Sequence, residues 1–159
     1  MDDFEAIYAR YFTQVYRYAL QLTGSSGAAE ELTAETFFKA LKKIDSFGGG
    51  NIQAWLCQIA KNRWYNQLRR KGREVPLDED FDHESEEMPL HLALESGEAA
   101  GSLHKKLHDL PEPYREVFTL RVFCELPFAQ IAALFGKTEG WARVTFHRAR
   151  NKLQSELEE

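Results

Sequence analysis

The sequence predicts an all-α protein made of two small helical domains joined by a flexible acidic linker. Apolar residues recur at three-to-four spacing in the first and last thirds of the chain, and no segment shows convincing strand alternation. The helical periodicity disappears from Gly72 to about Ser102, where two prolines and a dense acidic run occur. We therefore expect domains at residues 1–73 and 103–159, with the linker at residues 74–102.

The first domain is expected to contain three helices. Residues 3–22 carry apolar side chains on one face and predict an amphipathic helix that ends before a Thr-Gly pair. A second helix follows the GSSG turn, with Glu30 and Glu31 in its first turn. Three consecutive glycines make residues 45–51 a loop, and a third helix is expected from about residue 52 to residue 70.

The second domain is expected to end in a helix-turn-helix. After a helix at residues 114–122, two helices at residues 128–135 and 138–156 are separated by only Gly136 and Lys137. A helical wheel of the last helix turns Ala142, Phe146, Ala149 and Leu153 inward, and Arg143, Val144, His147, Arg148 and Asn151 outward. Thr138 is the expected N-cap, and its neighbouring amides could meet a phosphate.

The outward set of the last helix indicates duplex DNA binding. Guanidinium groups suit guanine edges or phosphates, and the remaining side chains lie where a helix enters the major groove. The alternative at this point is a solvated basic face on a small helical bundle.

The third helix combines aromatic and cationic residues in the manner of single-strand binders. Aromatic faces stack on unpaired bases while Lys and Arg hold the backbone. The residues concerned are Trp55, Trp64, Tyr65, Lys61, Arg63, Arg69, Arg70, Lys71 and Arg73. Trp55 occupies an apolar position and is expected in the core, whereas Trp64 and the basic run are expected to contact nucleic acid.

The net charge of −5 is distributed unevenly along the chain. Residues 1–73 hold 11 Lys and Arg against 7 Asp and Glu, residues 74–100 hold none against 10, and residues 101–159 hold 9 against 8. One short segment therefore supplies the acidity, and the remainder of the chain is compatible with a nucleic-acid partner.

Other classes of protein are disfavoured. No stretch approaches the roughly 18 apolar residues of a membrane span, and the N-terminus lacks signal-peptide order, so we expect a cytoplasmic protein without membrane insertion. Cys57 and Cys124 are expected to be buried thiols. We expect neither a metal site nor a cofactor, although His104 and His108 are one helical turn apart, and no nucleotide-binding or nucleophile motif indicates an active site.

Together these segments resemble the sigma factors of bacterial RNA polymerase, in particular the extracytoplasmic-function (ECF, group IV) branch of the sigma-70 family, which retains regions 2 and 4. AEELTAETFFKALKKIDSF at 29–47 resembles the region 2 helix that docks on the polymerase, and AWLCQIAKNRWYNQLRR at 54–70 resembles the part that recognises the minus-10 element. Residues 110–153 resemble region 4. The resemblance implies a bundle of three or four helices for region 2 and a helix-turn-helix (winged-helix-like) domain of four helices for region 4.

The resemblance also implies roles for individual residues. Polymerase docking falls on Leu32, Glu35, Phe38, Lys39 and Leu41. Contacts around the melted minus-10 strand fall on Asn51, Trp55, Lys61, Asn62, Arg69 and Arg70, which Trp64 joins from the pattern above. The residues implied to contact the minus-35 element as duplex are Arg143, Val144, His147 and Arg148, with Thr138 and Asn151 beside them.

The implied function is promoter-specific transcription initiation without catalysis. The implied partners are bacterial core RNA polymerase, promoter DNA and an anti-sigma factor. Two other interpretations remain at this stage: a helix-turn-helix regulator that binds an operator without joining polymerase, and a helical interaction protein with no DNA role.

Overall fold

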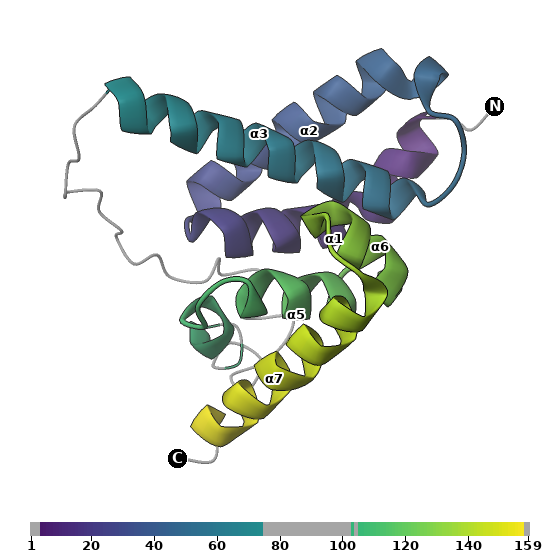
Figure 1. Ribbon diagram of the computed structural model, residues 1–159. Coiled ribbons are helices and arrows are strands. Elements are labelled where there is room, and N and C mark those ends of the chain that lie inside the picture. Colours follow the sequence, from purple (N-terminus) through teal and green to yellow (C-terminus); the bar gives the residue numbers. More distant parts are fainter. Residues whose placement is uncertain (1–3, 75–102, 104, 158–159) are drawn as a thin grey trace. The chain divides into compact units, whose positions relative to one another are not determined.

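The computed structural model describes residues 4–74, 103 and 105–157 (Figure 1). Within those residues every regular element is a helix and no strand occurs. The chain divides into two compact units, one within residues 1–85 and the other within residues 86–159. This confirms the all-α, two-unit prediction, while the predicted linker lies outside the described residues except for Glu74.

The first unit is a bundle of three helices. They are α1 (Phe4–Thr23), α2 (Ser26–Lys43) and α3 (Ile52–Glu74), and each packs against the other two (Figure 1). A single 3₁₀ turn at Ile44–Ser46 follows α2 and leads into the glycine loop. This arrangement leaves one side of α2 and one side of α3 exposed to solvent.

Aromatic side chains form much of the core of the first unit. Phe37 of α2 is 3% exposed, and its ring lies 4.9 Å from Tyr8, 6.3 Å from Phe4 and 6.4 Å from Phe12, all on α1. Aromatic pairs at such separations add to the free energy gained from burying apolar area. The α1 stripe that the sequence predicted as apolar therefore holds α2 in place.

The second helix begins earlier than the sequence analysis predicts. The hydroxyl of Ser25 accepts the N–H of Ala28 at 3.2 Å, so Ser25 is the N-cap and the helix starts at Ser26. Glu30 and Glu31 consequently lie beyond the first turn, and the prediction that they lie in it is wrong. The GSSG stretch contains the cap instead of a turn that precedes the helix.

The third helix is longer than predicted. Gly49 and Gly50 both have φ of +101° and form the expected loop before it. At the other end α3 continues past residue 70 to Glu74. Arg and Lys are good helix formers, which is consistent with the extension.

The second unit ends in the predicted pair of helices. Its helices are α5 (Tyr114–Val122), α6 (Phe128–Phe135) and α7 (Glu139–Leu157), and residues 105–108 are also helical (Figure 1). α7 packs against both α5 and α6. α6 and α7 therefore start and end within one residue of the predicted positions.

The inward face of α7 is the one that the helical wheel predicted. Ala142 and Ala149 are fully buried, Leu153 is 3% exposed, and Phe146 stacks on Phe118 with ring centroids 5.6 Å apart. Leu107, Leu110 and Phe118 complete this core from the segment before α7. The opposite face of α7 is thereby directed to solvent.

Two smaller predictions are also tested by the structure. Cys57 and Cys124 are both free and buried, as predicted. Among the described residues, no helix combines the length and the apolar character that crossing a membrane requires.

Candidate nucleic-acid interfaces

The turn between α6 and α7 is fixed by a glycine and a threonine. Gly136 has φ of +66° and its N–H points to the carbonyls of Ala132 and Ala133, which closes the end of α6. The hydroxyl of Thr138 accepts the N–H of Trp141 at 3.1 Å, which confirms Thr138 as the N-cap of α7. The two helices are thus locked into a helix-turn-helix.

All five side chains of the predicted outward face are exposed on α7. They are Arg143, Val144, His147, Arg148 and Asn151. Val144 is 48% exposed although it is apolar, so it is available for contact with another molecule. The structure brings this set together on one helix face that no other described element of the second unit covers.

Arg143 is held in place before any ligand binds. Its guanidinium lies 2.7 Å from the carboxylate of Glu139, one turn earlier, and 4.9 Å from the ring centroid of Phe128 on α6. Arg121 lies 4.0 Å from the same ring and donates to the carbonyl of Leu126 at 3.1 Å. One aromatic ring therefore positions two arginines from different helices.

Trp141 lies on the same helix, outside the set of residues that the sequence predicts for this interface. Its indole is half-buried, with its ring 5.2 Å from Phe135 and the ammonium of Lys137 5.9 Å from its centroid. Trp141 stands three residues before Val144 and seven before Arg148, so the three share one side of α7. That spacing is the signal that could have found it.

Two of the residues matched to the minus-10 contacts have structural roles at the start of α3. The side-chain oxygen of Asn51 accepts the N–H of Ala54 at 2.9 Å and caps the helix. Trp55 is half-buried against the core, with its ring 4.7 Å from that of Phe47. The apolar position of Trp55 in the sequence predicts a core residue, and these contacts support that prediction.

The rest of the predicted single-strand set follows along α3. It comprises Lys61, Asn62, Trp64, Arg69 and Arg70. Trp64 is half-buried, whereas Arg69 and Arg70 are exposed, and the ammonium of Lys61 lies 4.9 Å from the Tyr65 ring centroid. α3 thus presents aromatic and cationic groups along its length, as a single-strand platform requires.

An exposed apolar patch lies on α2. Phe38 is 64% exposed and Leu41 is 48% exposed, with exposed Lys39 between them in sequence. The ammonium of Lys42 lies 5.2 Å from the Phe38 ring centroid. Large apolar side chains one turn apart on a surface suit contact with another protein.

Two other members of the predicted docking set face inward. Leu32 is 2% exposed and belongs to the core. Glu35 lies 3.0 Å from the guanidinium of Arg63 and accepts from Gln67 at 3.2 Å, so it joins α2 to α3. The hydrogen bond with Glu35 raises the pKa of Arg63.

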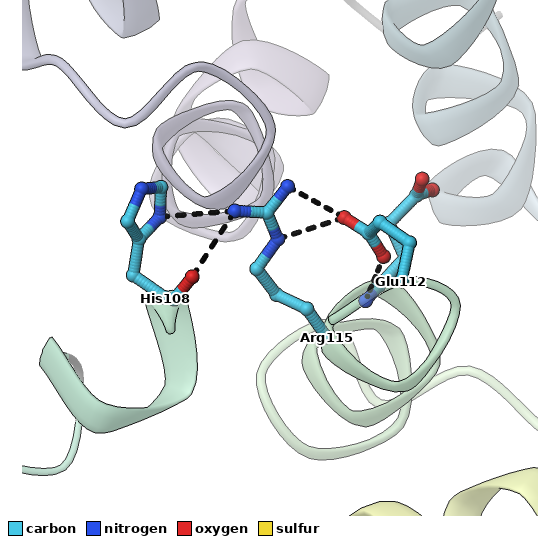
Figure 2. Close-up of polar contacts among 4 residues, drawn as sticks. His108, Glu112 and Arg115 are labelled. Carbon is cyan, nitrogen blue, oxygen red and sulfur yellow. Dashed lines mark hydrogen bonds and ion pairs between the residues drawn. The ribbon is translucent and has the colours of Figure 1, made fainter. Parts of the chain in front are cut away.

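A polar cluster joins the helical residues 105–108 to α5 (Figure 2). The guanidinium of Arg115 lies between its two partners, 2.6 Å from the carboxylate of Glu112 and 3.2 Å from the carbonyl of His108. Glu112 also accepts the backbone N–H of Glu116 at 3.0 Å. Partial burial raises the pKa of Glu112, and the charge of Arg115 offsets this only in part.

The histidine pair singled out in the sequence is tested only in part. His104 lies outside the described residues, and the ring Nδ1 of His108 is 3.2 Å from the guanidinium of Arg115. Within residues 4–74, 103 and 105–157, no three His, Cys, Asp or Glu side chains are grouped so that they could hold a metal ion.

Comparisons with known proteins agree over both units. Residues 7–74 match the model of Sigma-70 region 2, and residues 100–153 match that of Sigma-70, region 4. The chain is 28% identical to the ECF RNA polymerase sigma factor SigM of Bacillus subtilis, over 95% of this chain and 93% of that protein. It is 32% identical to the ECF RNA polymerase sigma factor EcfG of Rhodopseudomonas palustris, over 88% and 77% respectively.

A solved structure is similar over nearly the whole length of both chains. It is the sigma factor RpoE of Bartonella quintana, crystallised in complex with the anti-sigma factor NepR. The TM-score is 0.84 and the identity 31%, and the similarity covers 99% of this chain and 98% of that one.

Proposed function

The chain belongs to the ECF sigma factors of bacterial RNA polymerase, and from that premise we propose that its two units divide the recognition of a promoter between them. The observation that carries the proposal is the presence, in one chain, of two different exposed faces suited to nucleic acid. The face on α7 follows a helix-turn-helix, and the face on α3 combines aromatic and cationic side chains. An operator-binding regulator or a DNA-free interaction protein would leave the region 2 match unexplained.

The face on α7 reads the minus-35 element as duplex. The first turns of a recognition helix enter the major groove, where Arg143 and Arg148 can donate to guanine edges or to phosphates. Val144 is exposed beside them, and His147 and Asn151 extend the same surface. Thr138 fixes the start of the helix close to the sugar-phosphate backbone.

The face on α3 captures bases of the melted minus-10 element. Trp64 offers a stacking surface, while Lys61, Arg69 and Arg70 neutralise the strand. This binding energy is realised only when the strands separate, so it shifts the equilibrium from closed to open DNA. Opening then requires no catalytic step by this chain, which acts as a non-catalytic subunit.

The minus-10 set also includes residues that hold α3 itself. Asn51 and Trp55 fix the start of the helix, and the side chain of Asn62 accepts from Gln58 at 2.9 Å on its exposed surface. We propose that Asn51, Trp55 and Asn62 contact the edge of the same DNA strand, and that their main role is to hold α3 in place.

The patch on α2 docks on core polymerase. Phe38, Lys39 and Leu41 supply the surface, while Leu32 and Glu35 hold α2 in the bundle behind it. Residues 1–73 then act as region 2, residues 103–159 as region 4, and residues 74–102 as an acidic connector that begins at Glu74, the last residue of α3. Since these partners are in the cytoplasm, the chain acts there.

An anti-sigma factor is the expected inhibitory partner. The solved relative was crystallised with one. A protein that covers the patch on α2 or the face of α7 would block polymerase or promoter DNA directly.

The docking surface is tested by one substitution with two matched controls. Phe38→Ser should weaken binding of the chain to purified core polymerase by about tenfold or more, because burying a Phe side chain contributes about 1.5–3 kcal/mol. Val144→Ser changes another exposed apolar residue, on the other unit, and should leave polymerase binding unchanged. Phe37→Ser should instead unfold the bundle, since Phe37 is 3% exposed.

Binding is measured by fluorescence titration, with circular dichroism as the check on folding. The proposal fails if the wild-type chain does not bind core polymerase. The docking assignment fails if folded Phe38→Ser binds as tightly as the wild type.

A further inference from the structure

Trp141 lies near the start of the second helix of the helix-turn-helix, outside the residues proposed above to contact the minus-35 element. It is the third residue of α7, and its backbone N–H is fixed by the hydroxyl of Thr138 at 3.1 Å. The N-terminal residues of a recognition helix are those that contact base edges. A large aromatic side chain therefore stands at the end of α7 that meets the bases.

The surroundings of the indole hold it at the surface. The ring of Phe135, at the end of α6, lies 5.2 Å away at an angle of 47°, and the ammonium of Lys137 lies 5.9 Å from the indole centroid. The side chain is only half-buried by these neighbours. The apolar indole of Trp141 thus lies beside the cation of Lys137. In duplex DNA a base edge likewise lies beside a phosphate, so the two protein groups can contact the two DNA groups together.

Helical spacing aligns Trp141 with two of the proposed reading residues. Val144 is three residues further on and Arg148 seven, so all three lie on one side of α7. Two apolar side chains therefore precede a guanidinium along this side. In the major groove the apolar feature of a base pair is the 5-methyl group of thymine, and the arginine partner is guanine.

We propose that Trp141 is a specificity-determining residue of the minus-35 contact, where its indole packs against the 5-methyl group of thymine while Lys137 binds the adjacent phosphate. The inference rests on the proposed function of α7 and adds to it the chemical group that is read. It also predicts that the preferred minus-35 element contains a thymine at the position facing the start of α7.

The other explanation of Trp141 is purely structural: the indole covers Phe135 and stabilises the turn. A structural role lowers affinity for every duplex alike, because it acts on the whole helix. A methyl contact lowers affinity only for duplexes that carry the methyl group. Replacing thymine by deoxyuridine removes that group alone and keeps base pairing, so it separates the two explanations.

The experiment uses holoenzyme assembled from the full chain and core polymerase. A promoter pool with a randomised minus-35 segment first gives the preferred sequence, and fixed duplexes are then made with each minus-35 thymine singly replaced by deoxyuridine. For wild type, one replacement should reduce binding about fourfold, the value expected for loss of one buried methyl group. Trp141→Ala should bind the thymine and deoxyuridine duplexes equally at that position.

Two further variants complete the design. Trp141→Phe keeps a ring against Phe135 with a smaller surface, so its thymine preference should fall between the others, and it remains informative if Trp141→Ala fails to fold. Lys137→Ala should weaken both duplexes to the same extent and lower the salt slope of binding by about one.

If wild-type holoenzyme initiates and prefers thymine, but Trp141→Ala and Trp141→Phe keep the same preference, the inference about Trp141 is wrong while the proposed function stands. The inference is also wrong if no replacement of thymine by deoxyuridine changes the binding of wild-type holoenzyme. Failure of wild-type holoenzyme to initiate at any member of the pool overturns the proposed function and the inference with it.

Discussion

Replacing Arg115 by Met should destabilise the unit that contains α5, α6 and α7. The Nε group of Arg115 donates to the carboxylate of Glu112 at 2.7 Å, and Nη1 donates to the carbonyl of His108 at 3.2 Å. Met matches the unbranched stem of Arg as far as Nε and carries no donor. The substitution therefore removes the hydrogen bonds that join the first turn of α5 to the helical residues before it (Figure 2).

The expected loss in free energy of unfolding is about 2 kcal/mol. Hydrogen bonds to charged groups contribute roughly 1.5–3 kcal/mol when buried, whereas exposed ion pairs contribute less than about 1 kcal/mol. The side chains of Arg115 and Glu112 are 17% and 33% exposed, so this pair lies between the two cases.

The loss should also depend on pH. Partial burial holds the pKa of Glu112 above its usual value of 4.5, and Arg115 opposes that rise. Without Arg115 the pKa rises further, so folded protein holds the proton at pH values where unfolded protein has released it. Stability then falls as pH rises through this window, and the loss caused by Arg115→Met is larger at pH 7 than near pH 4.5.

Urea unfolding measures this loss if the signal comes from the second unit alone. The chain has three tryptophans, and Trp55→Phe with Trp64→Phe leaves Trp141 as the reporter. Adding Glu112→Gln to Arg115→Met should recover part of the stability at pH 7, because it removes the unpaired carboxylate. A loss below about 0.5 kcal/mol, or one that grows as pH is lowered, would refute this reasoning.

Three further substitutions test the proposed interfaces and the turns that hold them. Glu139→Gln frees Arg143 and should strengthen holoenzyme binding to minus-35 duplex about twofold in fluorescence anisotropy, because i,i+4 pairs contribute about 0.3–0.5 kcal/mol; weaker binding would contradict it. Gly136→Ala should cost about 1 kcal/mol in urea unfolding because of its positive φ, and an unchanged midpoint would be inconsistent with the turn described. Asn51→Ala should lose about 1 kcal/mol with the α3 cap, whereas Asn51→Asp keeps the cap; if permanganate footprinting shows that Asn51→Asp opens promoter DNA as well as wild type, Asn51 acts through the cap alone.

The sequence predicts most of the local structure because the determining signals are local. Gly136 and Thr138 end one helix and begin the next, so the bounds of α6 and α7 follow closely from residue type. Two Ser residues stand between Gly24 and Gly27, and the pattern alone did not show that Ser25 caps the helix. That ambiguity accounts for the misplaced start of α2.

The candidate interfaces are harder to predict because they depend on which face of a helix the neighbours cover. The match to the docking motif selects Leu32 and Phe38 alike, yet one is buried and the other is 64% exposed. The link between Glu35 and Arg63 joins residues 28 apart in sequence, and no local pattern indicates it. Trp141 is harder to assign to the interface because an aromatic residue on a helix is usually part of the core.

In vitro transcription with defined components tests the central claim most directly. Core polymerase free of any sigma factor is incubated with a promoter library, with and without this chain, and the 5′ ends of the transcripts are sequenced. Initiation should concentrate at a subset of promoters that share one minus-35 and one minus-10 element only when the chain is present. Transcripts with the same 5′ ends in both reactions would contradict the claim that this chain selects where polymerase begins.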